Sequence, residues 1–192
     1  MSPRMGLDLP TILQAAAEIA DAKGWEEVTL AALAQKLEIR SPSLYNHVDG
    51  LSGLRKKLAV YGLDLLYERL VQATVGVSGD DAVIAFARAY LSFARAHPGL
   101  YPCTQRAPEE RDDAYAQRAE KIVELIVRVL QGYGLQGDEA LHTIRGLRSL
   151  LHGFALLEKD GGFGLPLDLD TSFSLLIDTF LAGIHSLQRR SS

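Results

Sequence analysis

Between residues 41 and 47 the sequence SPSLYNH places several hydrogen-bonding side chains next to one another. An asparagine amide such as that of Asn46 can pair bidentately with adenine, and a serine hydroxyl can bond several bases. Leu44 and Val48 are the apolar members of this stretch, so we expect them to face inward. Ser43, Asn46 and their polar neighbours are then left on the outer side. A short helix of this kind suits insertion into the major groove of DNA.

Two short helices joined by a tight turn are needed to hold these side chains in place. Thr29 is a suitable N-cap for the first, because its hydroxyl accepts from an amide in the first helical turn. The pattern breaks at Glu38–Arg40 and resumes with Ser41 as the next cap and Pro42 at the first helical position. The first helix has one apolar face, formed by Leu30, Leu33, Ala34 and Leu37.

The rest of the chain favours an all-α fold, because helical spacing recurs and no strand alternation is found. A helix from Pro10 to about Gly24 completes a three-helix head. We expect residues 1–50 to form a helix-turn-helix DNA-binding domain, a helix over 51–75 to connect it, and residues 76–192 to form a helical domain for effector binding and dimerisation. Further helices are expected at 80–97, about 112–132, 138–158 and 171–188. In the arm before the head, Arg4 either follows a phosphate or belongs to a frayed terminus.

Charge and composition limit the possible partners. The net charge is −4, and residues 1–60 contain seven Lys or Arg and seven Asp or Glu, so DNA affinity must come from local sorting of charge. The single cysteine, Cys103, excludes an intrachain disulfide. No histidine pair has metal-ligand spacing, and no catalytic set has a recognisable spacing. We therefore expect no metal, no cofactor and no enzymatic activity. With no leader and no membrane-spanning run, a cytoplasmic protein is expected.

The segment LAQKL…SPSLYNHV, followed by Leu54, resembles the DNA-binding unit of the TetR family of transcriptional regulators. The resemblance implies that Tyr45 and His47 contact backbone phosphates. It also implies that Thr29 bonds a phosphate. Two positions depart from the family pattern, with Glu38 where glycine is common in the turn and Leu51 where a phosphate-binding lysine is common. Arg40 and Lys56, with Arg55 and Lys57, are the cations left to supply the attraction to DNA. The positions implied to approach base edges or methyl groups are Ser41, Pro42, Ser43 and Asn46.

A second, weaker match lies in the C-terminal part of the chain. His97-Pro98-Gly99-Leu100-Tyr101 and His152-Gly153-Phe154 resemble the WHG-type TetR C-terminal domain, although the tryptophan expected before His152 is missing. The middle helices carry aromatic and apolar residues that suit a small-molecule cavity. The alternative for the same residues is a filled core without a ligand. The predicted ligand-binding residues are Phe86, Tyr90, Phe93, Tyr101, Ile122 and His152.

The last two expected helices have broad apolar faces and several small residues, which favours close helix approach. Two such helices from each chain would form a four-helix bundle in a homodimer. A dimer would place two recognition helices over a palindromic operator in double-stranded DNA. By resemblance, a small-molecule effector would control a regulator of this type, most often a repressor. The small residues in question are Gly146, Ser149, Gly153, Ala182 and Gly183.

Two other classes of function stay open at this point. One is a helical ligand-binding or protein-interaction module whose head no longer binds DNA, which Glu38, Leu51 and the neutral head would favour. An enzyme whose catalytic residues converge only in the fold is the other.

Overall fold

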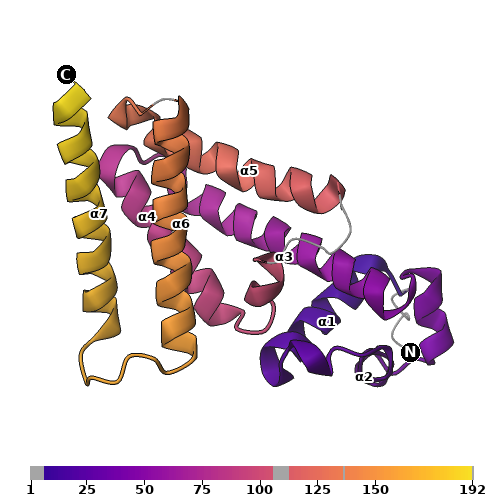
Figure 1. The fold of residues 1–192 in the computed structure, drawn as a ribbon. Helices are drawn as coiled ribbons and strands as arrows, with labels where there is room; N and C mark the ends of the chain where they lie inside the picture. The colour runs from indigo at the N-terminus through magenta and orange to yellow at the C-terminus, as the bar shows by residue number, and fades with distance from the viewer. Residues whose placement is uncertain (1–6, 106–112, 136, 192) are drawn as a thin grey trace. The chain divides into compact units, whose positions relative to one another are not determined.

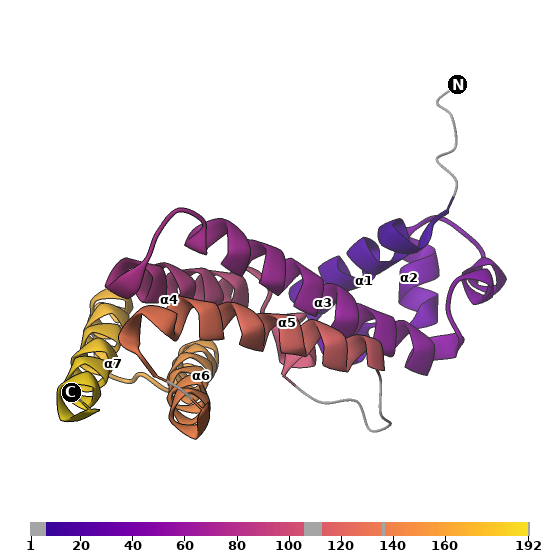
Figure 2. The ribbon, with the colours of Figure 1, turned by 90° about the horizontal axis from the view of Figure 1, so that it is seen from above.

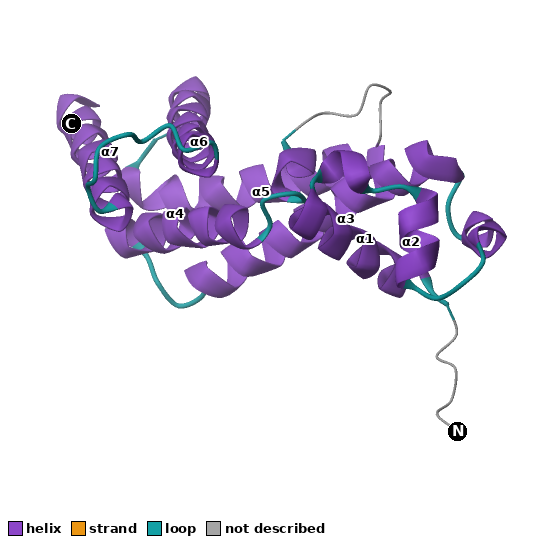
Figure 3. Ribbon diagram, turned by 90° about the horizontal axis from the view of Figure 1, so that it is seen from below, coloured by secondary structure: helices purple, strands orange, loops and turns teal. Residues whose placement is uncertain are grey.

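The computed structural model describes residues 7–105, 113–135 and 137–191 of the chain. Within these ranges the regular structure is entirely helical (Figure 1 and Figure 3). The predicted all-α class is therefore confirmed. Arg4 lies outside the described residues. The α-helices are α1 (Leu9–Lys23), α2 (Leu30–Lys36), α3 (Gly50–Thr74), α4 (Gly79–Ala96), α5 (Asp113–Leu130), α6 (Gly137–Lys159) and α7 (Leu169–Ser191). Short 3-10 helices are η1 (Trp25–Glu27), η2 (Ser41–Asn46), η3 (Tyr101–Thr104) and η4 (Gln131–Tyr133).

The chain divides into two compact units that do not follow the sequence in simple order. The first contains Met1–Leu65 and Ala96–Arg118, and the second contains Leu66–Arg95 and Ala119–Ser192. The head therefore shares its unit with η3 and the start of α5. The division into a DNA-binding domain at 1–50 and an effector domain at 76–192 stays a prediction about function.

The helix ends of the head are set by local capping. Asp8 caps α1 by accepting a hydrogen bond from the Thr11 amide at 2.9 Å. Thr29 caps α2 as predicted, its hydroxyl accepting from the Ala32 amide at 3.1 Å. Gly24 ends α1 with a φ of 100°, a conformation that favours glycine. The Asp8 and Thr29 side chains thus satisfy amides that would otherwise lack partners in the first turns of α1 and α2.

Glu38 ends α2 in the left-handed conformation, with a φ of 55°. Its amide donates to the Gln35 carbonyl at 3.2 Å, and the Ile39 amide donates to the Ala34 carbonyl at 3.0 Å. These two bonds form a Schellman motif with glutamate at the position that usually holds glycine. Glu38, noted in the sequence where glycine is common, therefore adopts a left-handed conformation that is strained for a residue with a Cβ.

The core of the first unit joins α1, α2, η2 and α3. Ile12, Ala16, Leu33 and Leu44 are all almost completely buried, as are Val28 and the α3 residues Leu54 and Leu58. Of the apolar face predicted for α2, Leu33 and Ala34 are buried, whereas Leu30 and Leu37 are half-buried. The short helices are thus held mainly by tertiary packing, because helices of this length are marginal alone.

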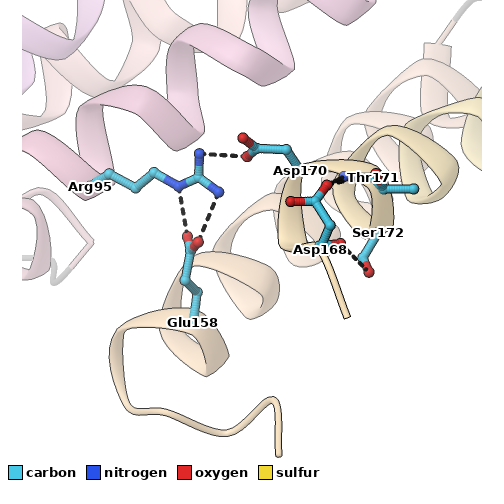
Figure 4. Close-up of polar contacts among 6 residues, drawn as sticks. All are labelled: Arg95, Glu158, Asp168, Asp170, Thr171 and Ser172. Carbon is cyan, nitrogen blue, oxygen red and sulfur yellow. Dashed lines mark hydrogen bonds and ion pairs between the residues drawn. The ribbon is translucent and has the colours of Figure 1, made fainter. Parts of the chain in front are cut away.

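In the second unit α6 and α7 run antiparallel side by side, joined by the loop at 160–168 (Figure 1 and Figure 2). Arg95 at the end of α4 binds both helices (Figure 4). Its guanidinium donates to the two Glu158 oxygens at 2.9 and 2.8 Å and lies 2.7 Å from an Asp170 oxygen. Asp168 caps α7 by accepting from the Thr171 amide at 2.7 Å, which is why the helix begins before the predicted residue 171.

Candidate DNA-binding surface

The second short helix expected from the sequence is present as the 3-10 helix η2 (Ser41–Asn46), with His47 as its C-cap. Arg40 is its N-cap, Pro42 lies in its first two positions, and no side chain caps it. The prediction that Ser41 is the cap was therefore wrong. The Ser43 amide donates to the Arg40 carbonyl at 2.9 Å, an i to i+3 bond. The helix has only six residues, because it lies between the left-handed turn at Glu38 and the turn before α3. Helices this short often adopt 3-10 geometry.

Burial within η2 and its flanks sorts the residues into an inner and an outer set. Leu44 is fully buried and Val48 is 2% exposed, as predicted. Tyr45 is 61% exposed, a large value for an aromatic side chain. Arg40, Pro42 and Asn46 are also exposed, and Ser41, Ser43 and His47 are half-buried. The residues predicted to approach bases and phosphates are therefore all at least partly accessible from solvent.

The cations of the head are not equally available. The Arg55 guanidinium lies over the Trp25 ring, 5.3 Å from its centroid, and 3.6 Å from a Glu26 oxygen. Arg55 therefore holds η1 against α3, and its charge is already balanced. Lys56 and Lys57 on α3 are half-buried, whereas Arg40 is exposed. Arg40 is thus the most accessible of the four cations considered from the sequence.

Two further groups affect the electrostatics of this surface. Thr29 is half-buried and uses its hydroxyl oxygen as the cap of α2, which leaves its hydroxyl proton available to an outside acceptor. Hydrogen bonding by Thr11 lowers the pKa of Asp8, and the charge of His47 adds a smaller effect in the same direction.

The predicted ligand-binding residues do not all fall in one unit. Phe86, Tyr90 and Phe93 are buried on α4 in the second unit, which also contains the half-buried Ile122 on α5 and His152 on α6. Tyr101 is 1% exposed in η3 of the first unit. Burial, with a smaller effect from Arg148, lowers the pKa of His152, so this imidazole is neutral at neutral pH.

An open apolar groove of about 850 Å³ lies along α6 and α7. None of the six predicted ligand-binding residues, all of them described, lines this groove. Gly146 and Gly183, two of the small residues singled out in the sequence, do. A Cβ added to Gly183 would meet no atom within 4 Å, which shows that the helix surface is open there. The groove is lined by Glu139, His142, Thr143, Gly146, Thr179, Phe180, Gly183, Ile184, Ser186 and Leu187.

Other kinds of site are not evident in the part of the chain that the structure describes. Within it, no three His, Cys, Asp or Glu residues are grouped in a way that could hold a metal ion. No described helix combines the length and apolar character that a membrane span requires.

A capped helix, a left-handed turn and an exposed short helix form a helix-turn-helix unit, and the comparisons with known proteins give the class of protein that carries it. Residues 83–180, about half of the chain, match the model of the tetracyclin repressor-like C-terminal domain. An uncharacterised HTH-type transcriptional regulator of Bacillus subtilis, YobS, is 41% identical over 96% of each chain. A second, Rv0681 of Mycobacterium tuberculosis, is 35% identical over 97% of this chain and 84% of its own.

Solved structures show the same fold at lower sequence identity. A protein of unknown function from Rhodococcus sp. RHA1 superposes with a TM-score of 0.82 at 22% identity, over 95% of this chain and 98% of its own. The TetR family protein ActR of Streptomyces coelicolor, in complex with (S)-DNPA, gives 0.64 at 21% identity, over 97% and 99%. The chain belongs to the TetR family and is a helix-turn-helix DNA-binding transcriptional regulator.

Several residues that shape this surface gave no signal in the sequence. The stacking of Arg55 on Trp25 joins residues thirty positions apart, and neither has a characteristic spacing. The hydrogen bonds from His97, Gly99 and Leu100 to Asp21 span more than seventy positions. His97 and Gly99 belong to the His97–Tyr101 segment noted for its resemblance to a C-terminal domain, but the sequence did not indicate Asp21 as their partner.

Proposed function

We propose that this regulator binds a palindromic operator as a homodimer, acts as a repressor and releases DNA when a small molecule binds its C-terminal region. Such a protein acts in the cytoplasm, with DNA as its partner, and has no catalytic role. The observation that carries the proposal is the exposed surface of η2. There Tyr45 and Asn46 project from a short helix that is fixed from below by the buried Leu44 and Val48.

In this proposal the DNA contacts divide by chemistry. Ser41, Pro42, Ser43 and Asn46 meet base edges and thymine methyl groups, which specify sequence. Tyr45, His47 and Thr29 meet phosphates, which fix the register of the head on the duplex. Arg40 and Lys56 supply attraction to the backbone. Because only these two cations are assigned to phosphates, the affinity falls only moderately with salt.

The homodimer is supported by the groove along α6 and α7. Gly146 and Gly183 line the groove together with the apolar Phe180 and Ile184. Ser149 and Ala182 are exposed on the same two helices. Small residues on neighbouring helices allow a second pair of helices to approach closely in a four-helix bundle.

The effector is proposed to be a small molecule bound among the helices of the C-terminal region. ActR, a neighbour in fold, was solved with a small molecule bound. We assign the site to residues of the second unit alone, namely Phe86, Tyr90, Phe93, Ile122 and His152. The neutral His152 is suited to hydrogen-bond an uncharged polar group of such a ligand.

Fluorescence anisotropy with duplex DNA from upstream of the gene tests the DNA-binding proposal. Wild type is expected to bind this DNA in the presence of scrambled competitor, and Tyr45→Ala is expected to lose most of the affinity. Leu165→Ala, which truncates a side chain with 73% exposure in the α6–α7 loop, is the matched control and should bind normally. If wild type binds the upstream DNA no better than scrambled DNA, the experiment is repeated with a random-sequence pool of duplexes. A second failure to find a preferred sequence would favour a ligand-binding module whose head does not bind DNA.

Sedimentation velocity of Gly183→Arg tests the homodimer. Because the position is open, the arginine fits a single chain, but it fills the space that a second helix pair requires. We expect a folded monomer with a helical circular dichroism spectrum. Gln117→Arg, an exposed substitution on α5, should remain dimeric. A dimeric Gly183→Arg would show that the interface lies elsewhere.

A further inference from the structure

The Asp21 carboxylate, in the last turn of α1, is bonded three times by the segment 97–100. One oxygen accepts from the Gly99 amide at 3.0 Å and from the Leu100 amide at 2.9 Å. The other oxygen lies 2.7 Å from Nδ1 of His97. A carboxylate near the C-terminal end of a helix is opposed by the helix dipole. The three bonds explain why an acid is tolerated at this place.

The segment fits α1 so closely that only glycine is possible at its centre. A Cβ on Gly99 would lie 1.8 Å from the Ala20 carbonyl oxygen and 2.7 Å from the Asp21 backbone nitrogen. Both are backbone atoms, which cannot move aside as a flexible side chain can. Leu100 beside it is fully buried. The backbone of residues 99–100 is therefore seated directly on the last turn of α1.

The same segment is also fixed to α3, the other helix that supports the head. A Cβ on Gly62 would lie 2.8 Å from a Thr104 methyl carbon and 3.2 Å from a Leu100 carbon, so α3 and η3 are in close contact. The Tyr115 hydroxyl donates to the Thr104 carbonyl at 2.9 Å. Residues 97–104 thus bridge the end of α1 and the middle of α3 within one compact unit.

We propose that Asp21 is a positioning residue for DNA binding, and that it sets the orientation of α1, and with it that of α2 and η2, through its bonds to residues 97–100. The inference rests on the proposed DNA contacts of η2 and adds the element that aligns them. We call Asp21 with His97, Gly99 and Leu100 the latch.

Positioning and simple stabilisation differ in what they do to operator affinity. If the latch only stabilises the fold, Asp21→Ala lowers the melting temperature, but the protein that remains folded binds DNA as before. If the latch orients the head, folded Asp21→Ala binds DNA less tightly. The dependence of its Kd on salt stays unchanged, because no phosphate contact is removed.

The experiment measures the operator Kd and its salt slope for Asp21→Ala, Asp21→Asn and Ile177→Val. The melting temperature of each variant is measured first, and the binding experiments are run well below it. The probe is a duplex selected by wild type from a random-sequence pool. We expect a rise in Kd of about tenfold for Asp21→Ala, within the usual 5–150-fold range of coupling between distant sites. Asp21→Asn keeps an oxygen that accepts from both amides, so it should recover most of the affinity. Ile177→Val, a core change on α7, controls for lost stability alone and should leave Kd unchanged.

The outcomes separate the two proposals. If wild type binds and Tyr45→Ala does not, but folded Asp21→Ala binds like wild type, the positioning role is wrong and the DNA-binding proposal stands. If wild type itself does not select a sequence, both fall together. Should Asp21→Ala fail to fold, His97→Gln takes its place. That variant removes one of the three bonds, and a Kd equal to that of wild type would refute the positioning role.

Discussion

Replacing Glu38 by glycine should stabilise the head, because Glu38 adopts a φ of 55° in the Schellman motif that ends α2. The left-handed conformation costs an ordinary residue about 1–2 kcal/mol. Glycine removes this cost but gives the unfolded chain more freedom, which offsets about 0.4–1 kcal/mol. The net gain expected is about 0.5–1 kcal/mol. For an m-value of about 2 kcal/mol/M, the urea midpoint would rise by about 0.3–0.5 M.

Trp25 offers a direct assay, because it is the only tryptophan in the chain and lies in η1 of the head. Its fluorescence during urea unfolding reports the stability of the unit that contains Glu38. Gln35→Gly is the matched control, since it adds the same residue to the helical part of α2, where glycine costs about 1 kcal/mol. A midpoint for Glu38→Gly that falls as far as that of Gln35→Gly would refute the argument that backbone strain resides at Glu38.

Two other predictions concern the cap of α2 and the pH dependence of the second unit. Thr29→Ala should cost about 1 kcal/mol in the same urea assay, because the Ala32 amide loses its acceptor; Thr29→Ser should retain most of the stability. A hydrogen bond to Asp80 raises the pKa of His185 above its usual 6.5, so this bond stabilises the fold below pH 6.5 and is lost as the pH rises through the folded-state pKa. Hydrogen bonds from Tyr133 and, to a lesser extent, His185 lower the pKa of Asp80 below its usual 3.8. The ionised Asp80 therefore stabilises the fold above pH 3.8, and this stabilisation is lost as the pH falls through the folded-state pKa. Thermal unfolding should therefore show His185→Gln to be more destabilising at pH 5.5 than at pH 8.5, and an equal loss at both would contradict the assignment.

The sequence was informative wherever the determining interaction is local. Thr29 could be identified as a cap because its partner is three residues away, and the apolar spacing located the main helices to within a few residues. Glu38 was noted where glycine is common in the turn, and the structure shows that this position is left-handed. The failure at Ser41 was local too, because a six-residue helix starting near a proline can be 3-10 or α without a change in the apolar pattern.

Long-range contacts could not be predicted in the same way. Asp21 reads as an ordinary exposed acid on α1, and only the fold brings it to Gly99. Arg55 looked like a candidate for a phosphate contact until the structure placed it over Trp25. Tyr101 was grouped with Phe86 and Tyr90 by its apolar character, although the chain contributes it to a different unit. Burial and pairing of this kind depend on which elements pack together, and residue spacing does not encode that.

Sequence selection by wild type and by Asn46→Ala tests the central claim most directly, namely that η2 reads base pairs in two symmetric half-sites. Wild type should select a palindrome with half-sites about one helical turn, or 34–36 Å, apart or a multiple of this. Asn46→Ala should keep the spacing and lose preference at the same base pair in both half-sites, by about 1–3 kcal/mol if the amide pairs bidentately. An unchanged preference at every position would contradict the assignment of base reading to this helix.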